Sequence, residues 1–162
     1  MNLLKTLLFT VLVPGTTLGV IPYLLLKTGR GKWTVDFIGF TVGGVLLVVL
    51  GVLIYLKCAW DFATRGQGTP SPHDPPRKLV ITGLYRYSRN PMYVGIIAIS
   101  GGEALLFHSY LLGLYALGLA LAFHIWIIIY EEPTLRRMFG EAYEEYCRRV
   151  PRWVGRRGPK AR

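Results

Sequence analysis

Four long stretches of the chain are nearly free of charge, and they limit the fold more than any other feature. Residues 37–56 carry no charged side chain, and residues 3–26, 92–107 and 110–130 carry at most one each. An α-helix rises ~1.5 Å per residue, so about 20 apolar residues cross the ~30 Å hydrocarbon core of a bilayer. Because 52% of the residues are hydrophobic and 17% charged, we predict an all-α membrane protein, a bundle of about four transmembrane helices.

The first apolar stretch, residues 3–26, allows two interpretations. Small residues near Gly15 and Gly19 would permit signal-peptide cleavage, and Lys5 gives the stretch a basic start. A signal peptide, however, usually has an apolar core of only about 7–15 residues. The greater length of this stretch favours a retained membrane helix.

Basic residues are concentrated between the second and third apolar stretches and again after Glu132. A net charge of +10 would suggest nucleic-acid binding in a soluble protein. In a membrane protein, clustered Lys and Arg mark the cytoplasmic side instead. The basic residues of the first loop, Lys27, Arg30 and Lys32, oppose this orientation but are fewer. We therefore expect a multi-pass integral membrane protein with its long loop and C-terminus in the cytoplasm, no nucleic-acid partner, and a basic tail that binds membrane lipids.

The chain has room for a single domain, 1–162, and no internal repeats. We expect it to be organised as a scaffold helical hairpin (1–60), a cytosolic cofactor-binding loop (61–91), a catalytic helical hairpin with a C-terminal amphipathic helix (92–153) and a basic tail (154–162). The amphipathic helix is predicted from apolar residues that recur every three or four positions, namely Leu135, Phe139, Tyr143, Tyr146 and Val150. The two cysteines and three histidines have no metal-ligand spacing, so we expect no metal site.

The third and fourth apolar stretches are joined by only a short turn, near His108 and Ser109. They should form a tight antiparallel hairpin, in which residues equally far from the turn face each other. His124 should then face Tyr93, and Glu131 should lie opposite Arg86. The sequence thus predicts that Glu131 and Glu132 meet the segment 83–90 at the cytoplasmic membrane surface.

Segment 83–95, with the sequence GLYRYSRNPMYVG, and the pair Glu131–Glu132 carry the candidate chemistry. Taken alone, Asn90 and Pro91 are typical of a helix start, and the glutamates could be helix-end charges paired with Arg136. Together they could bind a ligand with both charges: a helix N-terminus attracts an anionic group, and the carboxylates attract a cation or a hydroxyl. Tyrosines of the same segment offer aromatic faces to a sulfonium.

The motif from residue 79 to 95, with Glu131–Glu132, Phe139–Gly140, Tyr143, Tyr146 and Val150–Pro151, resembles the isoprenylcysteine carboxyl methyltransferase family and the wider group that includes phospholipid N-methyltransferases. The resemblance covers residues 64–153. It implies a membrane helix bundle that encloses S-adenosylmethionine near the cytosolic face. The cofactor contacts that it implies are Gln67, Arg77, Lys78, Leu79, Val80, Tyr85, Asn90, Pro91, Met92, Tyr93 and Glu131, with Arg89 and Glu132 in support.

Two positions depart from the family pattern. Asn90 stands where the family commonly has His, and an amide can still donate a hydrogen bond. Ile127 stands four residues before Glu131, where the prenylcysteine enzymes have a substrate-binding arginine. Together with Glu103 and His124, Ile127 is a candidate for the substrate cavity. Glu103 could instead be a protonated carboxyl hydrogen-bonded within the bundle.

The resemblance predicts a methyltransferase dependent on S-adenosylmethionine and acting on a lipophilic acceptor within the bilayer. Carboxyl O-methylation of an isoprenylcysteine-like or other lipid-like substrate is one reading. N-methylation of a phospholipid or another amine is the alternative, and a non-catalytic membrane scaffold is a third. Glu131 is expected to anchor the cofactor, and no residue is assigned as catalytic.

Overall fold

The computed structural model describes residues 12–33, 37–61, 64 and 79–155. Its elements are η1 (Thr16–Val20), α2 (Ile21–Lys27), α3 (Ile38–Asp61), η3 (Gly83–Arg86), α4 (Pro91–Leu106), α5 (Tyr110–Trp126), η4 (Ile127–Glu131), α6 (Glu132–Phe139) and α7 (Glu141–Arg149). Of these, η1 and η4 are π-helical and η3 is a 3-10 helix. Within the described ranges the all-α prediction is confirmed, since the only strand-like feature is one isolated bridge between Lys32 and Ser109.

Two helices are long and apolar enough to cross a membrane. They are α3, with 24 residues, and the continuous helical stretch from α5 through α6, with 30 residues. The apolar helices Leu12–Lys27 and Pro91–Leu106 are shorter. The 16 residues of α4 extend only ~24 Å at the usual rise per residue. Length and composition therefore give two candidate spans where the sequence predicted about four.

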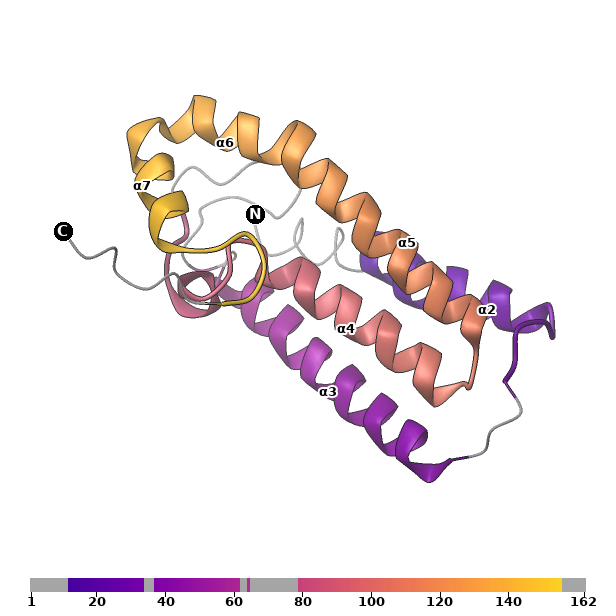
Figure 1. The fold of residues 1–162 in the computed structure, drawn as a ribbon. Coiled ribbons are helices and arrows are strands. Elements are labelled where there is room, and N and C mark those ends of the chain that lie inside the picture. The colour runs from indigo at the N-terminus through magenta and orange to yellow at the C-terminus, as the bar shows by residue number, and fades with distance from the viewer. Residues whose placement is uncertain (1–11, 34–36, 62–63, 65–78, 156–162) are drawn as a thin grey trace.

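Helices α3 and α4 lie side by side (Figure 1) and meet through glycines. A Cβ atom on Gly51 would lie 2.6 Å from the carbonyl oxygen of Gly95, and one on Gly102 would lie 2.8 Å from that of Gly44. Small residues allow membrane helices to approach this closely and gain van der Waals contact. This glycine contact makes α4 the main partner of α3, whereas α2 packs against α5.

The predicted hairpin of α4 and α5 is confirmed, with its turn at His108 and Ser109. His108 adopts a positive φ of 50°, and the Ser109 hydroxyl caps α5 by accepting a hydrogen bond from the amide of Leu112. At the other end of the hairpin, the rings of Tyr93 and Phe123 pack with their centroids 4.5 Å apart. The hairpin thereby brings segment 83–95 and the pair Glu131–Glu132 to the same end of the molecule.

The C-terminal amphipathic segment is two helices rather than one. Gly140, with φ of 52°, ends α6 and begins α7, because a residue with positive φ cannot continue a right-handed helix. The apolar side chains predicted to form one face do pack together, in a cluster of Leu79, Leu135, Phe139, Tyr143, Tyr146, Cys147 and Val150. The chain reversal at Gly140 folds α7 back toward η3 and the start of α4 (Figure 1).

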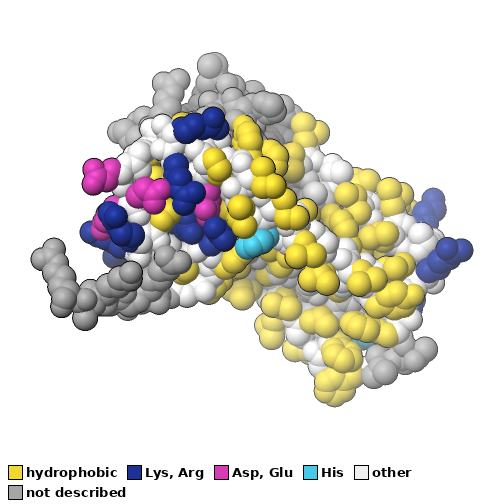
Figure 2. Space-filling view, turned by 45° about the horizontal axis from the view of Figure 1, so that its top comes forward, with side chains coloured by type: hydrophobic (Ala, Val, Ile, Leu, Met, Phe, Trp, Pro, Cys, Tyr) yellow, Lys and Arg dark blue, Asp and Glu magenta, His cyan; other side chains and the backbone are white. Residues whose placement is uncertain are grey.

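The surface is divided between charged and apolar regions. Figure 2 shows Lys, Arg, Asp and Glu side chains gathered at the end formed by α6 and α7, and a smaller group of Lys and Arg at the opposite end. Hydrophobic side chains cover most of the visible face between them. Large apolar side chains are exposed along α3, including Leu46, Leu53 and Leu56, and along α5, including Leu117 and Leu121. Exposed apolar surface of this extent suits contact with lipid tails rather than with water.

Candidate functional site

Two direct contacts join the motifs at the end of the α4–α5 hairpin. The hydroxyl of Tyr93 donates a hydrogen bond of 2.9 Å to Glu131, 38 residues further along the chain. A guanidinium nitrogen of Arg89 lies 3.0 Å from a carboxylate oxygen of Glu132. The predicted approach of the carboxylate pair to segment 83–90 is confirmed. Arg86, which was expected opposite Glu131, is exposed.

Glu131 closes the π-helical element η4 and is partly buried. Its hydrogen bond from Tyr93 comes from a neutral phenol, and no described cation lies within ion-pair distance of it. π-Helical turns are rare and often occur at functional sites. Glu131 is therefore a carboxylate whose second oxygen can still accept a hydrogen bond from a bound ligand.

Glu132, by contrast, is fully engaged with the protein. The Arg152 guanidinium donates to both of its oxygens, at 2.7 and 3.1 Å, and Arg89 lies at 3.0 Å. Arg136, the partner expected for a helix-end charge, is more distant at 3.8 Å. Because Glu132 is only 4% exposed, it needs these two close arginines to offset the cost of burying its charge. Glu132 holds the site together and is not free to bind a ligand.

Arg89 is also occupied by protein groups. Besides Glu132, its guanidinium donates to the thiol sulfur of Cys147 at 2.8 Å and to the Tyr143 hydroxyl at 3.4 Å. Its backbone amide donates to the carbonyl oxygen of Pro151 at 3.0 Å. Arg89 therefore connects the segment before α4 with α6 and α7, in keeping with the supporting role expected of it.

Asn90 and Pro91 begin α4 as predicted, but the Asn90 side chain does not cap the helix. Its amide nitrogen donates instead to the carbonyl oxygen of Arg152 at 3.0 Å. The backbone amide of Asn90 donates to the Ser88 hydroxyl, also at 3.0 Å. The polar groups at this helix start are thus directed toward the C-terminal segment of the chain.

Three predicted contacts, Val80, Tyr85 and Met92, belong to a buried cluster with Tyr55 and Cys58 at the end of α3. The Tyr85 carbonyl accepts a hydrogen bond of 2.7 Å from the hydroxyl of Tyr146 on α7. Burial raises the pKa of both phenols, so each keeps its proton and remains a donor. This cluster positions η3 between α3 and α7. Leu79 packs on the neighbouring cluster of α6 and α7.

The three substrate-cavity candidates have different surroundings. Ile127 is completely buried. His124 does not take the place opposite Tyr93, which Phe123 occupies; its Nδ1 accepts a hydrogen bond of 3.2 Å from the Trp153 indole. Glu103 is about three turns along α4 from Tyr93, ~15 Å away along the axis, toward the turn of the hairpin. Gln67, Arg77 and Lys78 fall outside the described residues.

Arg152 and Trp153 contribute to the site although no sequence pattern indicated a role for them. Arg152 binds Glu132, and Trp153 stacks on His124 with ring centroids 6.0 Å apart. A role for Ser88 was not predicted either; its hydroxyl donates to the Arg152 carbonyl at 3.4 Å. These contacts span many residues and have no local spacing. The one sequence signal is Pro151, which follows the end of α7, because a proline shortly after a helix end is common where the chain changes direction.

A family model for phospholipid methyltransferase matches residues 40–142 of the chain. The match includes α3, the α4–α5 hairpin and both glutamates, and it ends just after α7 begins. Comparisons with curated proteins and with solved structures gave no match.

Proposed function

Because the chain belongs to the phospholipid methyltransferase family, whose members are S-adenosylmethionine-dependent methyltransferases of lipid-like substrates, we propose that it methylates a lipophilic acceptor at the end of the α4–α5 hairpin. The observation that supports this location is the Tyr93–Glu131 pair, a partly buried carboxylate hydrogen-bonded to a neutral donor. Its neighbour Glu132 binds two arginines, so the two glutamates perform different tasks.

The residues at this site fit the cofactor. S-Adenosylmethionine carries an ammonium group and ribose hydroxyls, and the second oxygen of Glu131 can accept a hydrogen bond from either. Its sulfonium is a cation without a hydrogen-bond donor, which an aromatic face can stabilise. Tyr93 and Phe123 supply such faces next to Glu131. We assign Glu131 and Tyr93 as the principal described contacts, with Asn90, Pro91 and Tyr85 shaping the site around them.

When bound, the cofactor supplies an electrophilic methyl group, so the chain need not form a covalent bond to the substrate. Its residues have to hold donor and acceptor in line and keep water away, and such positioning accounts for a large part of the rate in reactions of this kind. The buried hydrophobic cluster that includes Tyr55, Tyr85 and Met92 limits water access from the α3 side. We assign no general base.

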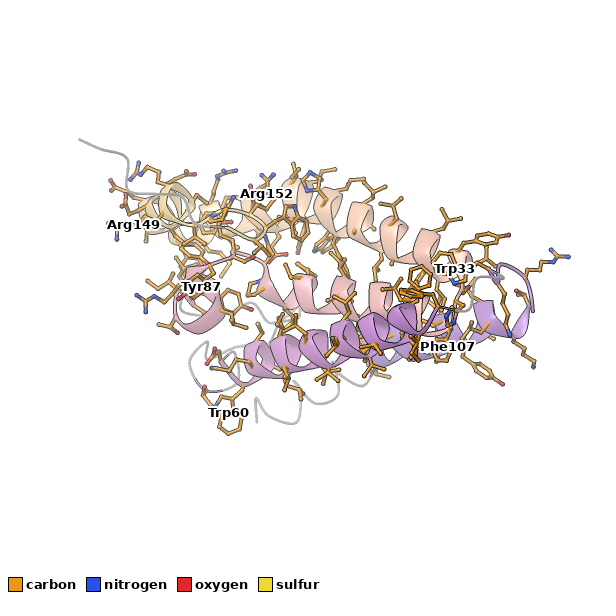
Figure 3. All side chains as sticks on the ribbon, turned by 60° about the horizontal axis from the view of Figure 1, so that its bottom comes forward. Trp33, Trp60, Tyr87, Phe107, Arg149 and Arg152 are labelled. Atoms are coloured by element: carbon orange, nitrogen blue, oxygen red, sulfur yellow. The ribbon has the colours of Figure 1, made fainter. Side chains whose placement is uncertain are left out.

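We further propose that all four apolar helices cross the bilayer and that the site lies at its cytoplasmic surface. The larger group of charged side chains lies at the end formed by α6 and α7, and a smaller basic group lies at the opposite end (Figure 2). The larger group is expected to mark the cytoplasmic face. Figure 3 shows Trp60 and Tyr87 toward the same end as Arg149, and Trp33 and Phe107 at the opposite end. Aromatic side chains at both ends are typical of the two membrane interfaces.

The residue at position 127 favours an amine over a carboxylate as the methyl acceptor. Ile127 stands where the resembling prenylcysteine enzymes have an arginine, and its complete burial leaves no cation there for a substrate carboxylate. N-methylation of a lipid amine is therefore our first choice, and carboxyl O-methylation is the alternative.

A methyl-transfer assay with isotope-labelled S-adenosylmethionine tests the proposal. The full chain, purified in detergent and returned to vesicles, is offered an aminophospholipid, a prenylated cysteine and a lipid without amine or carboxyl. We expect label in the aminophospholipid, stable to mild base. Base-labile label in the prenylated cysteine would establish the carboxyl alternative. If none of these lipids is labelled by a protein that binds the cofactor, the proposed acceptor class is wrong.

A further inference from the structure

We propose that the C-terminal strap, residues 150–153, positions the cofactor site, and that Arg152 is the positioning residue through which it acts. The inference rests on the proposed function, because the site in question is the one around Tyr93 and Glu131. It adds a part of the chain beyond the family match, which ends at residue 142. Figure 1 shows the strap as the yellow segment that leaves α7 and passes the start of α4.

The backbone of the strap contacts the segment before α4 through three hydrogen bonds. The Pro151 carbonyl accepts from the amide of Arg89 at 3.0 Å. The Arg152 carbonyl accepts from the Asn90 side chain at 3.0 Å and from the Ser88 hydroxyl at 3.4 Å. All three donors come from consecutive residues, so the strap fixes the conformation of the segment that precedes Tyr93 by one turn.

The side chains of the strap contact the opposite part of the site. Arg152 donates to both oxygens of Glu132, a two-pronged arrangement that fixes orientation as well as distance. One residue later, Trp153 donates from its indole nitrogen to His124 on α5 at 3.2 Å. The strap therefore bridges the start of α4, which carries Tyr93, and the part of the α5–α6 helix around η4, which carries Glu131.

The position of Arg152 explains why a residue that need not touch the cofactor can control its binding. Glu131 and Glu132 are neighbours on one helix, so any rotation that follows the loss of an arginine from Glu132 also moves Glu131. Arg89 alone would hold Glu132 from one side, at 3.0 Å. Without Arg152, the orientation of the Glu131 carboxylate is no longer fixed, and its hydrogen bond from Tyr93 is weakened.

The test compares Arg152→Gln with Arg149→Gln in the full chain. Both variants remove one positive charge from the same end of the molecule. Arg149, however, has a side chain that is 76% exposed and pairs with the surface residue Glu145. We expect Arg152→Gln to weaken calorimetric binding of S-adenosylmethionine by about tenfold to a hundredfold, the change that follows from losing the charge-assisted hydrogen bond between Glu131 and the cofactor. Arg149→Gln should bind the cofactor as the wild type does. Arg152→Lys should have an intermediate affinity, because lysine keeps the charge but cannot donate two parallel hydrogen bonds to Glu132.

A second readout follows the strap itself. In the cofactor-free protein, hydrogen exchange at the Arg89 amide, which is bonded to Pro151, should accelerate in Arg152→Gln and stay unchanged in Arg149→Gln. Unchanged exchange and unchanged cofactor affinity in Arg152→Gln would overturn the inference. If Arg152→Gln does not fold, Arg152→Lys decides in its place by the same two measurements. A wild-type protein that fails to bind the cofactor, yet shows faster exchange in Arg152→Gln, would contradict the proposed function and leave the strap contact standing.

Discussion

The hydroxyl of Tyr93 on α4 donates a hydrogen bond of 2.9 Å to the carboxylate of Glu131 at the end of η4. Phe123 packs against the same tyrosine ring, so this contact lies where the two helices of the hairpin meet. Both residues are partly buried. The pair therefore links helix packing with Glu131, which of the two adjacent glutamates is the one that remains able to accept a hydrogen bond from a ligand.

Replacing Tyr93 by Phe should destabilise the cofactor-free protein. The substitution keeps the ring on Phe123 but removes the described donor to a partly buried carboxylate, and a hydrogen bond to a charged group typically contributes about 1.5–3 kcal/mol. Thermal unfolding in detergent measures the change, with Tyr110→Phe as the control, because Tyr110 is exposed. Equal melting temperatures for the two variants would show that the Tyr93 hydroxyl does not support the fold.

Glu132→Gln should be more destabilising than any substitution of a surface glutamate. It leaves Arg89 and Arg152 near a neutral amide at a buried position, and breaking a buried ion pair typically costs about 3–5 kcal/mol. Glu145→Gln is the matched control, since Glu145 pairs with Arg148 and Arg149 on the surface, where ion pairs contribute little. Similar unfolding temperatures for both variants would mean that Glu132 is not the structural centre described above.

Gly102→Ala and Gly101→Ala should differ sharply although they are neighbours. A Cβ on Gly102 would lie 2.8 Å from the Gly44 carbonyl oxygen, whereas one on Gly101 meets nothing within 4 Å. Overpacking of this kind typically costs about 1–3 kcal/mol. We expect Gly102→Ala to lower the melting temperature and Gly101→Ala to leave it unchanged. A stable Gly102→Ala protein would show that α3 and α4 are not held at this short distance.

The membrane orientation can be tested with single cysteines, because both native cysteines are buried. Cysteines at Ile81 and Val154, which are exposed, should react with a membrane-impermeant reagent from the cytoplasmic side. A cysteine at Arg30, an exposed residue in the loop after α2, should react from the opposite side. Labelling of Ile81 and Val154 from opposite sides would contradict the proposed four-helix orientation.

The approach of Glu131 and Glu132 to the segment before α4 could be predicted, because two helices joined by a short turn pack antiparallel. The resemblance distinguished Glu131, as the expected cofactor anchor, from Glu132, but the residues themselves could not predict which partners each would have. Adjacent residues project ~100° apart on a helix, and the sequence does not say which direction faces Tyr93 and which faces Arg152. The contacts of the strap could not be predicted either, since those with Ser88 and Asn90 join residues more than 60 positions apart.

The sequence contains patterns that could have predicted the glycine contact between α3 and α4 and the helix break at Gly140. Gly44 and Gly51 lie two turns apart, as do Gly95 and Gly102, which places each pair on one face of its helix. Gly140 follows an amphipathic turn that ends in arginines and Phe139, a common pattern at a helix end. In both cases the apolar periodicity gave the face that is buried but not the partner or the end of the helix.

The most direct test of the central claim is calorimetric binding of S-adenosylmethionine to the wild type, Glu131→Gln and Glu141→Gln. Glu141 is exposed at the start of α7, so its substitution controls for the loss of one negative charge. A charge-assisted hydrogen bond contributes about 1.5–3 kcal/mol, so we predict that Glu131→Gln weakens binding roughly tenfold to a hundredfold and that Glu141→Gln does not. A folded Glu131→Gln protein with wild-type affinity would remove Glu131 from the cofactor site and contradict the account.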